Sequence, residues 1–303
     1  MIMGKQLFFR YLCVFLLSIS SFSIQANEIT LSHNGITLNA ALELVPGKTI
    51  ADDIILITHG AMAHRDMEML VYLRNLLHEQ GFSTLAINLS LGLNNRRGMY
   101  DCKLVHGHHN VDAAKEISLW VEWLAKQGAK KISLLGHSRG GAQTALYAAS
   151  YKRDVVKSVV LMAPATIDNT SASAYQSRFK QPIAPLIKKA NLLVAAGKGS
   201  LVLDNANLLM CRDTPVMAST FLSYYGADAQ VDGPAYLKDI PHPVLVVVGG
   251  KDRIVSGLEK KITPMLEGSE ISMYVIPEAG HFFRDLNTDD AVDAIVEFIE
   301  GNK

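Results

Sequence analysis

Residues 136–140, with the sequence Gly-His-Ser-Arg-Gly, constrain the fold more than any other stretch of the chain. The preceding residues 131–135 form a short apolar run typical of a buried strand, and residues 141–149 are small residues and good helix formers. A G-x-S-x-G sequence between a strand and a helix is typical of a nucleophile elbow, a turn so sharp that the serine backbone is strained. The flanking glycines fit this interpretation, because a Cβ at either position would collide with the neighbouring strand or helix. The pattern predicts that the Ser138 hydroxyl projects from the carboxyl end of a sheet, with a helix N-terminus behind it.

The first 26 residues differ in character from the rest of the sequence. Lys5 and Arg10 precede a short apolar run over residues 11–17, and serines follow it before the small residue Ala26. This order is typical of a secretory signal peptide. A membrane anchor is the alternative, but the apolar run is shorter than the roughly 20 residues that a spanning helix needs. We therefore expect residues 1–26 to be a signal peptide cleaved near Ala26, which predicts an exported (periplasmic or secreted) protein with no stable membrane anchor.

Apolar runs and helical stripes alternate along residues 27–303. The expected strands are 28–31 and 36–44 (a hairpin), 53–58, 82–89, 131–135, 155–163, 243–250 and 270–276, and the expected helices are 68–80, 111–126, 141–149 and 288–300. Strands that alternate with helices predict an α/β fold in which a mostly parallel sheet is covered by helices on both faces. Residues from about 165 to 240 are richer in polar residues and show helical fragments without strands, so we expect a helical cap inserted over the carboxyl edge of the sheet.

The balance of charges argues against nucleic acid and other polyanions as binding partners. Lys and Arg number 29 against 29 Asp and Glu, and the chain is 49% hydrophobic. The composition therefore offers no basic field of the kind that binds nucleic acid. A small-molecule substrate that is neutral or mildly polar fits this balance better than a polyanion, and nothing in the sequence points to a particular oligomeric state.

Two polar residues follow later strands and complete a set with Ser138. Asp252 comes after the expected strand that ends near residue 248, and His281 comes after the one that ends near residue 276. The carboxyl ends of parallel strands meet at one edge of a sheet, so all three side chains are expected at that edge. A serine hydroxyl needs a base within hydrogen-bonding reach, and the base needs a carboxylate to orient it.

In these residues and their order, the chain resembles the α/β-hydrolase superfamily, from about Glu28 to the end apart from the cap. The resemblance implies the α/β-hydrolase fold. It also implies that Ser138 is the nucleophile, His281 the general base and acid, and Asp252 the carboxylate that holds the imidazole. Chemistry of this kind needs neither a metal nor an organic cofactor.

The resemblance extends to residues 59–61, His-Gly-Ala, which follow the expected strand 53–58 and are similar to the oxyanion-hole loop of the superfamily. It implies that the backbone N–H groups of Ala61 and Arg139 stabilise the oxyanion of the tetrahedral intermediate. The HGGG form found in lipases is absent, since only His-Gly is present. We expect His59 to brace this loop rather than to take part in the chemistry.

We therefore predict an exported serine hydrolase that cleaves a carboxylic ester of a small molecule through an acyl-enzyme. Thioesterase and amidase activity use the same three residues and stay open as alternatives. An alternative of a different class is a non-catalytic binding or accessory protein on the same scaffold. Failure of a fluorophosphonate to label the chain would favour that alternative.

Two other polar clusters allow more than one interpretation. The histidines in residues 106–109 lie near Asp101 and Cys102 and could suggest zinc, but zinc ligands must converge on one point and this run lies in one loop. We expect structural or solvated histidines, in a loop that could line the pocket. Arginines 96–97 could meet an acidic substrate group, although paired arginines in a polar loop are more often solvated.

Once a signal peptide is removed, two cysteines remain, Cys102 and Cys211. An even pair in an exported protein is a candidate disulfide, and two isolated thiols are the alternative. We hypothesise that this pair joins the loop after the fourth strand to the cap. In the chain-entropy model, a disulfide that closes a loop of about 100 residues contributes roughly 4 kcal/mol to stability.

Overall fold

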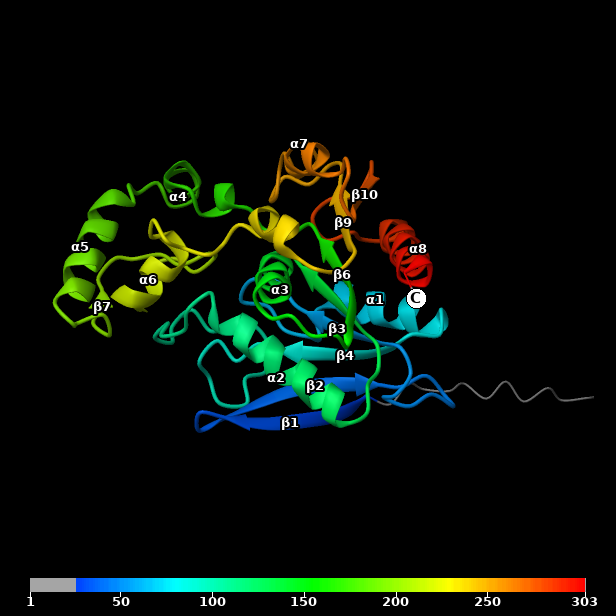
Figure 1. The fold of residues 1–303 in the computed structure, drawn as a ribbon. Coiled ribbons are helices and arrows are strands. Elements are labelled where there is room, and N and C mark those ends of the chain that lie inside the picture. Colours follow the sequence, from blue (N-terminus) through cyan, green and yellow to red (C-terminus); the bar gives the residue numbers. More distant parts are fainter. Residues whose placement is uncertain (1–25, 303) are drawn as a thin grey trace, which may run out of the picture.

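The computed structural model describes residues 26–302, in which a central sheet is flanked by helices and extended at one end by a cap (Figure 1). Apart from Ala26, the expected signal peptide lies outside the described residues and stays a prediction. No helix in the described range is long and apolar enough to cross a membrane.

The sheet has eight strands in the order β1-β2-β4-β3-β5-β6-β9-β10. The strands are β1 (Asn27–His33), β2 (Ile36–Glu43), β3 (Ile54–Thr58), β4 (Ser83–Asn88), β5 (Ile132–His137), β6 (Val156–Met162), β9 (Val244–Gly249) and β10 (Ile271–Ile276). β2 is antiparallel to both β1 and β4, and all other neighbouring strands are parallel. Strands β3, β4, β5 and β9 are buried along their whole length, because helices cover both faces. The predicted α/β-hydrolase fold is confirmed.

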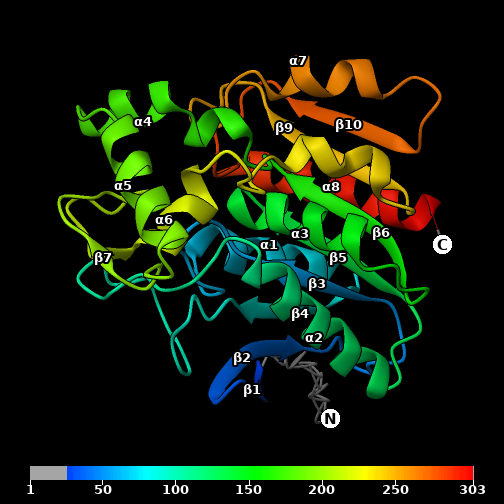
Figure 2. The same cartoon turned by 60° about the vertical axis from the view of Figure 1, so that its left-hand side comes forward.

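Two layers of helices enclose the sheet (Figure 2). On one face lie α1 (Glu68–Glu79) and α8 (Leu286–Gly301), which contribute to one apolar core with alternate residues of the strands. On the other face lie α2 (Asp112–Lys126), α3 (Arg139–Ser150), α7 (Leu258–Ile262) and the short 3₁₀ helix η3 (Thr263–Met265). Leu70, Leu73 and Leu77 form the buried stripe of α1, at the spacing that predicts an amphipathic helix.

The cap lies between β6 and β9 and covers the end of the sheet at which the parallel strands terminate (Figure 1). Its elements are η1 (Ile167–Thr170), α4 (Ala172–Phe179), α5 (Ala184–Ala195), β7 (Val202–Leu203), β8 (Val216–Met217) and α6 (Ala218–Tyr225). The cap has an apolar core that is separate from the two cores of the sheet. Tyr175 and Phe221 of the cap belong to it, together with Met62 and Tyr100 from the sheet domain. This shared core fixes the cap over the loops that follow β3 and β4.

The segment from about 165 to 240 differs from its prediction in two respects. It is not strandless, because β7 and β8 pair antiparallel. Its last part, η2 (Gly233–Asp239), packs on α3 of the sheet domain instead of on the cap. The contact is close: a Cβ on Gly233 would lie 3.1 Å from the Cα of Ala142. The cap proper therefore ends before Gly233.

Candidate active site

Ser138 lies in the sharp turn between β5 and α3. Its backbone has φ +56°, a left-handed conformation that is strained for a residue with a side chain. The turn is tight because a Cβ on Gly140 would lie 2.1 Å from the carbonyl oxygen of His59, and one on Gly136 would lie 2.6 Å from the carbonyl oxygen of Gly140. The two glycines thus permit the close approach that the motif predicts.

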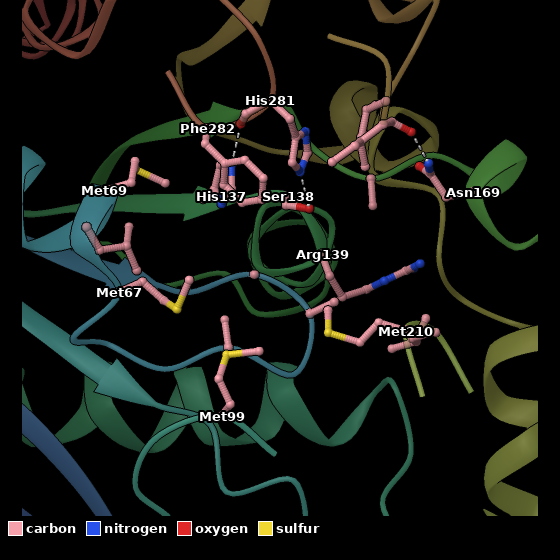
Figure 3. A pocket seen from close by; sticks show the side chains of 18 of the residues that line it. Met67, Met69, Met99, His137, Ser138, Arg139, Asn169, Met210, His281 and Phe282 are labelled. Atoms are coloured by element: carbon pink, nitrogen blue, oxygen red, sulfur yellow. Dashed lines mark hydrogen bonds between the residues drawn. The ribbon is translucent and has the colours of Figure 1, made fainter. Parts of the chain in front are cut away.

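Three side chains from three loops form one chain of hydrogen bonds, of which Figure 3 shows the contact between Ser138 and His281. The Ser138 Oγ lies 2.9 Å from the Nε2 of His281, and the Nδ1 of His281 lies 2.7 Å from the Oδ2 of Asp252. In the neutral imidazole, Nδ1–H donates to the carboxylate and Nε2 accepts the serine proton. Such an arrangement can deprotonate a serine hydroxyl as the serine attacks an acyl carbon.

Asp252 is held in its ionised form. Burial raises the pKa of this carboxyl, but hydrogen bonds from His281 and from two backbone N–H groups outweigh burial, so that its pKa is lowered overall. The two N–H donors are those of Ile254 (2.7 Å) and Val255 (2.9 Å), both to Oδ1. A charged carboxylate that is fixed in this way orients the imidazole and stabilises its protonated form.

The predicted oxyanion donors border the same cavity as Ser138, since both Ala61 and Arg139 line it. Arg139 is the first residue of α3, where a backbone N–H has no acceptor within its helix. Within residues 26–302, the N–H of Ala61 makes no hydrogen bond either. Both donors are therefore available to an oxygen atom beside Ser138.

His59 braces the loop that carries Ala61, as predicted. Its Nδ1–H donates to the Gly60 carbonyl (2.8 Å), and its Nε2 accepts from the Leu89 N–H (3.0 Å) and from the Nη2 of Arg96 (2.9 Å). Burial and the charge of Arg96 lower the pKa of His59 to about 3, so the ring is neutral. Arg96 is buried in this network instead of being solvated, which corrects the prediction for that residue.

The remaining arginine of the pair and the histidine run serve structural roles. Arg97 forms an ion pair with Glu28. His106 and His108 are buried, and burial lowers their pKa values to about 4 and about 3. His108 Nδ1 lies 3.0 Å from the hydroxyl of Tyr224 in α6. These histidines do not line the cavity that contains Ser138, and within residues 26–302 no three His, Cys, Asp or Glu side chains are grouped as metal ligands.

Cys102 and Cys211 form a disulfide whose Cα atoms are 5.3 Å apart. The bond ties the loop after β4 to the cap, the connection that the sequence suggested. Met99, which comes shortly before Cys102, and Met210, which immediately precedes Cys211, both line the cavity beside Ser138. The disulfide therefore fixes two parts of the cavity wall relative to each other.

The cavity beside Ser138 has a volume of about 410 Å³ and a mostly apolar wall. Four methionines contribute to it, two from the start of α1, one from the loop after β4 and one from the cap (Figure 3): Met67, Met69, Met99 and Met210. Unbranched, polarisable methionine side chains adapt to apolar groups of varied shape. The wall thus suits an apolar acyl group that is bonded to a carbonyl at Ser138.

His137 belongs to the site, but apart from its place in the elbow no sequence pattern identifies it. It is buried beside His281, with ring centroids 4.9 Å apart, and its Nε2–H donates to the main-chain carbonyl of His281 (2.9 Å). Burial, together with the nearby His281, lowers the pKa of His137 to about 3. A neutral ring in this place fixes the backbone of His281.

The side chain of Arg139 adds a buried positive charge to the site. The guanidinium is buried, its Nη1 donates to the carbonyl of Val231 (3.2 Å), and burial lowers its pKa. Arginine nonetheless stays protonated in proteins. This buried positive charge is a second feature of the site that the motif alone does not reveal.

Comparisons with known proteins identify the family and the fold of the chain. The sequence profile of the Alpha/beta hydrolase family matches residues 54–298. No curated protein matches the chain.

Several solved structures share the fold at low sequence identity. Est1E from Butyrivibrio proteoclasticus, solved with ferulic acid bound, is 19% identical with a TM-score of 0.66, over 90% of this chain and 98% of that one. The esterase PF2001 from Pyrococcus furiosus is 15% identical with a TM-score of 0.62, over 92% and 91% of the two chains. DcsB, in complex with its substrate analogue, is 20% identical with a TM-score of 0.65, over 92% and 99%. At these identities the likeness establishes the fold, and the family profile, which spans most of the sequence, shows that the chain belongs to the alpha/beta hydrolase family.

Proposed function

We propose that this protein is a serine hydrolase that cleaves a carboxylic ester through Ser138, His281 and Asp252. The observation that carries the proposal is the hydrogen-bond chain of 2.9 Å from serine to imidazole and 2.7 Å from imidazole to carboxylate. It occurs at a strained turn, beside a mostly apolar cavity. Each of these features has a direct use in acyl transfer.

The reaction runs in two halves. Ser138 Oγ attacks the ester carbonyl while His281 Nε2 takes its proton, and the N–H groups of Ala61 and Arg139 bind the oxyanion, at about 3 kcal/mol per donor. Collapse of the tetrahedral intermediate expels the alcohol, which receives its proton from His281. Water, deprotonated by the same histidine, then attacks the acyl-enzyme, and Ser138 leaves with the proton. Asp252 stabilises the imidazolium in both halves.

An ester with an apolar acyl part is the substrate class that the cavity supports best. Its wall is mostly apolar, and its volume of about 410 Å³ lies in the range of small-ligand sites. The structural neighbour from Pyrococcus furiosus, which is described as an esterase, supports an ester substrate in general. Thioesters and amides react by the same steps and belong in the same substrate panel.

We also propose that the protein acts outside the cytoplasm, in the periplasm or after secretion. The basic and apolar order of residues 1–26 supports export. The disulfide between Cys102 and Cys211 supports it independently, because structural disulfides persist in oxidising compartments. Cell fractionation with the mass of the mature N-terminus tests this part: a cytoplasmic protein that keeps residues 1–26 would contradict it.

Turnover of p-nitrophenyl esters of graded acyl length, from acetate to decanoate, tests the activity itself. We expect hydrolysis by the wild type that is lost in Ser138→Ala, with circular dichroism to show that the variant folds. If the folded wild type hydrolyses no ester, thioester or amide in the panel, a non-catalytic binding role replaces this proposal.

A further inference from the structure

Two arginines line the cavity beside Ser138 without an acidic partner. Arg139 and Arg178 both belong to its wall. Arg139 is the first residue of α3, and Arg178 lies in the last turn of α4. Within residues 26–302, neither is in an ion pair with a carboxylate. The wall is mostly apolar, and the positive charge of Arg139 is buried in it, so this charge in particular requires an explanation.

The burial of Arg139 makes its lack of a partner costly. Its exposed fraction is 4%, its Nε is buried without any hydrogen-bond partner, and one neutral carbonyl, that of Val231, accepts from its Nη1. A buried charge is destabilising unless it is paired and hydrogen-bonded. Figure 3 shows its side chain extending away from Ser138, between Met210 and Asn169.

Arg178 adds a second positive charge from the cap. It is exposed, and its Nη1 donates to the carbonyl of Leu209 (2.8 Å), which holds the guanidinium against a residue of the cavity wall. Burial is the main cause that lowers the pKa of Arg139, and the positive charge of Arg178 lowers it further. An anion in the cavity would supply the partner that the buried Arg139 lacks and would be attracted by Arg178 as well.

We propose that the cavity binds an ester whose acyl part ends in a carboxylate, which Arg139 and Arg178 recognise. The inference rests on the proposed function and narrows its substrate class. The ester carbonyl lies at Ser138, the apolar wall contacts the methylene chain, and the terminal carboxylate accepts hydrogen bonds from the two guanidinium groups. Charge-assisted hydrogen bonds of this kind are about twice as strong as neutral ones.

Matched esters test the proposal by varying only the end of the acyl chain. Monomethyl glutarate ends in a carboxylate, methyl 5-amino-5-oxopentanoate in a neutral amide, and methyl 5-methylhexanoate in an isopropyl group of similar shape. Monomethyl succinate and monomethyl adipate, each with its own terminal-amide and isopropyl counterpart, vary the length. For the wild type we expect kcat/KM to be at least about tenfold higher for the carboxylate than for the amide at one of these lengths.

Two variants assign the preference to the arginines. Arg178→Gln is expected to lower the ratio of kcat/KM for carboxylate over amide about tenfold, because the variant loses the charge that binds the carboxylate. Arg139→Met keeps the apolar stem and is expected to lower the same ratio at least as much. If Arg139→Met fails to fold, the exposed Arg178 still provides the test. Arg253→Gln is the control, because Arg253 is an exposed arginine next to Ile254 that does not itself line the cavity.

Each outcome has one meaning. A purely structural role for the arginines would lower kcat/KM for all esters alike and leave the ratio unchanged, which would overturn the inference. A wild type that prefers the amide or isopropyl ester at every length would overturn it as well. These results presuppose ester turnover: if the wild type hydrolyses no p-nitrophenyl ester either, the proposed function itself is wrong.

Discussion

His137 donates a hydrogen bond of 2.9 Å to the main-chain carbonyl of His281, and the rings of the two histidines lie 4.9 Å apart. One residue precedes the proposed nucleophile and the other is the proposed base, so this contact ties the elbow directly to the loop that must supply the base. The distance between Ser138 Oγ and His281 Nε2 therefore depends on a third side chain that takes no part in proton transfer.

Replacement of His137 is expected to disturb that geometry without unfolding the protein. In His137→Phe the ring volume is kept, but the His281 carbonyl loses its donor and the imidazole loses its fixed position. We expect kcat to fall by about 10- to 100-fold with KM little changed, because small displacements of a reacting group have large effects on rate. Steady-state kinetics on a p-nitrophenyl ester measure this. His242→Phe, at the other end of the sheet before β9, serves as control, and equal losses in both variants would contradict the assignment.

Asp252→Asn tests the orientation of the imidazole. An amide that donates towards Nδ1 favours the wrong tautomer of His281, so that Nε2 carries a proton and cannot accept one from Ser138. We expect kcat to fall by about 10⁴-fold, the size of effect known for a serine triad, while stability changes little. A loss below about tenfold would show that Asp252 does not orient the base.

Substitution by alanine is expected to affect stability strongly at Gly140 and hardly at all at Gly280. Gly140→Ala would bring a Cβ to 2.1 Å from the His59 carbonyl oxygen. The nearest atoms that it would meet all belong to the backbone of residues 58–59, which cannot move aside as a flexible side chain can. We expect a loss of more than about 2 kcal/mol in the free energy of unfolding, or no folded protein. Gly280→Ala has no atom within 4 Å of the new Cβ and should change stability by less than about 0.5 kcal/mol. Urea unfolding of both variants checks the contrast, which equal destabilisation would refute.

The disulfide is expected to stabilise the fold and the cavity together. The double variant Cys102→Ser/Cys211→Ser removes a cross-link over a sequence separation of 109 residues, for which the chain-entropy model gives about 4 to 5 kcal/mol. Because Met99 and Met210 lie close to the two cysteines, kcat/KM should fall more for a long acyl chain than for acetate. Chemical denaturation and the two esters measure the effects, and dithiothreitol-treated wild type should reproduce both. Unchanged stability in the variant and in the reduced protein would contradict this account.

Glu116 makes stability depend on pH. Burial raises the pKa of this carboxyl from 4.5 to about 7, against the hydrogen bonds from Ser90 that lower it. Between these two pH values the folded protein binds more protons than the unfolded chain, so the free energy of unfolding falls as the pH rises through about 7. Glu116→Gln removes this term. Relative to the variant, we expect the free energy of unfolding of the wild type to fall by up to roughly 3 kcal/mol between about pH 4.5 and pH 8. Urea unfolding at both pH values measures it, and a constant difference would show that Glu116 titrates normally.

The fold and the positions of Ser138, Asp252 and His281 can be predicted from the sequence, because short-range sequence patterns identify them. The elbow is a local motif, and Asp252 and His281 each follow a strand whose apolar run is easily recognised. Parallel strands then bring the loops to one edge, so the topology requires no further information.

Other features could not be predicted because they depend on contacts between distant residues. The hydrogen bond between His137 and His281 spans 144 positions. His137 occupies the first x position of the G-x-S-x-G motif, at which the motif specifies no residue type. Arg96 resembles a solvated loop residue until the fold buries it against His59. Strands β7 and β8 have two residues each, too few to show an alternating pattern.

The most direct test of the central claim is the intact mass of the purified protein after treatment with a fluorophosphonate. We predict a single adduct that peptide mapping places on Ser138, absent in Ser138→Ala and formed far more slowly in Asp252→Asn. A folded wild-type protein that acquires no adduct, or an adduct on another residue, would contradict the claim that Ser138 is an activated nucleophile.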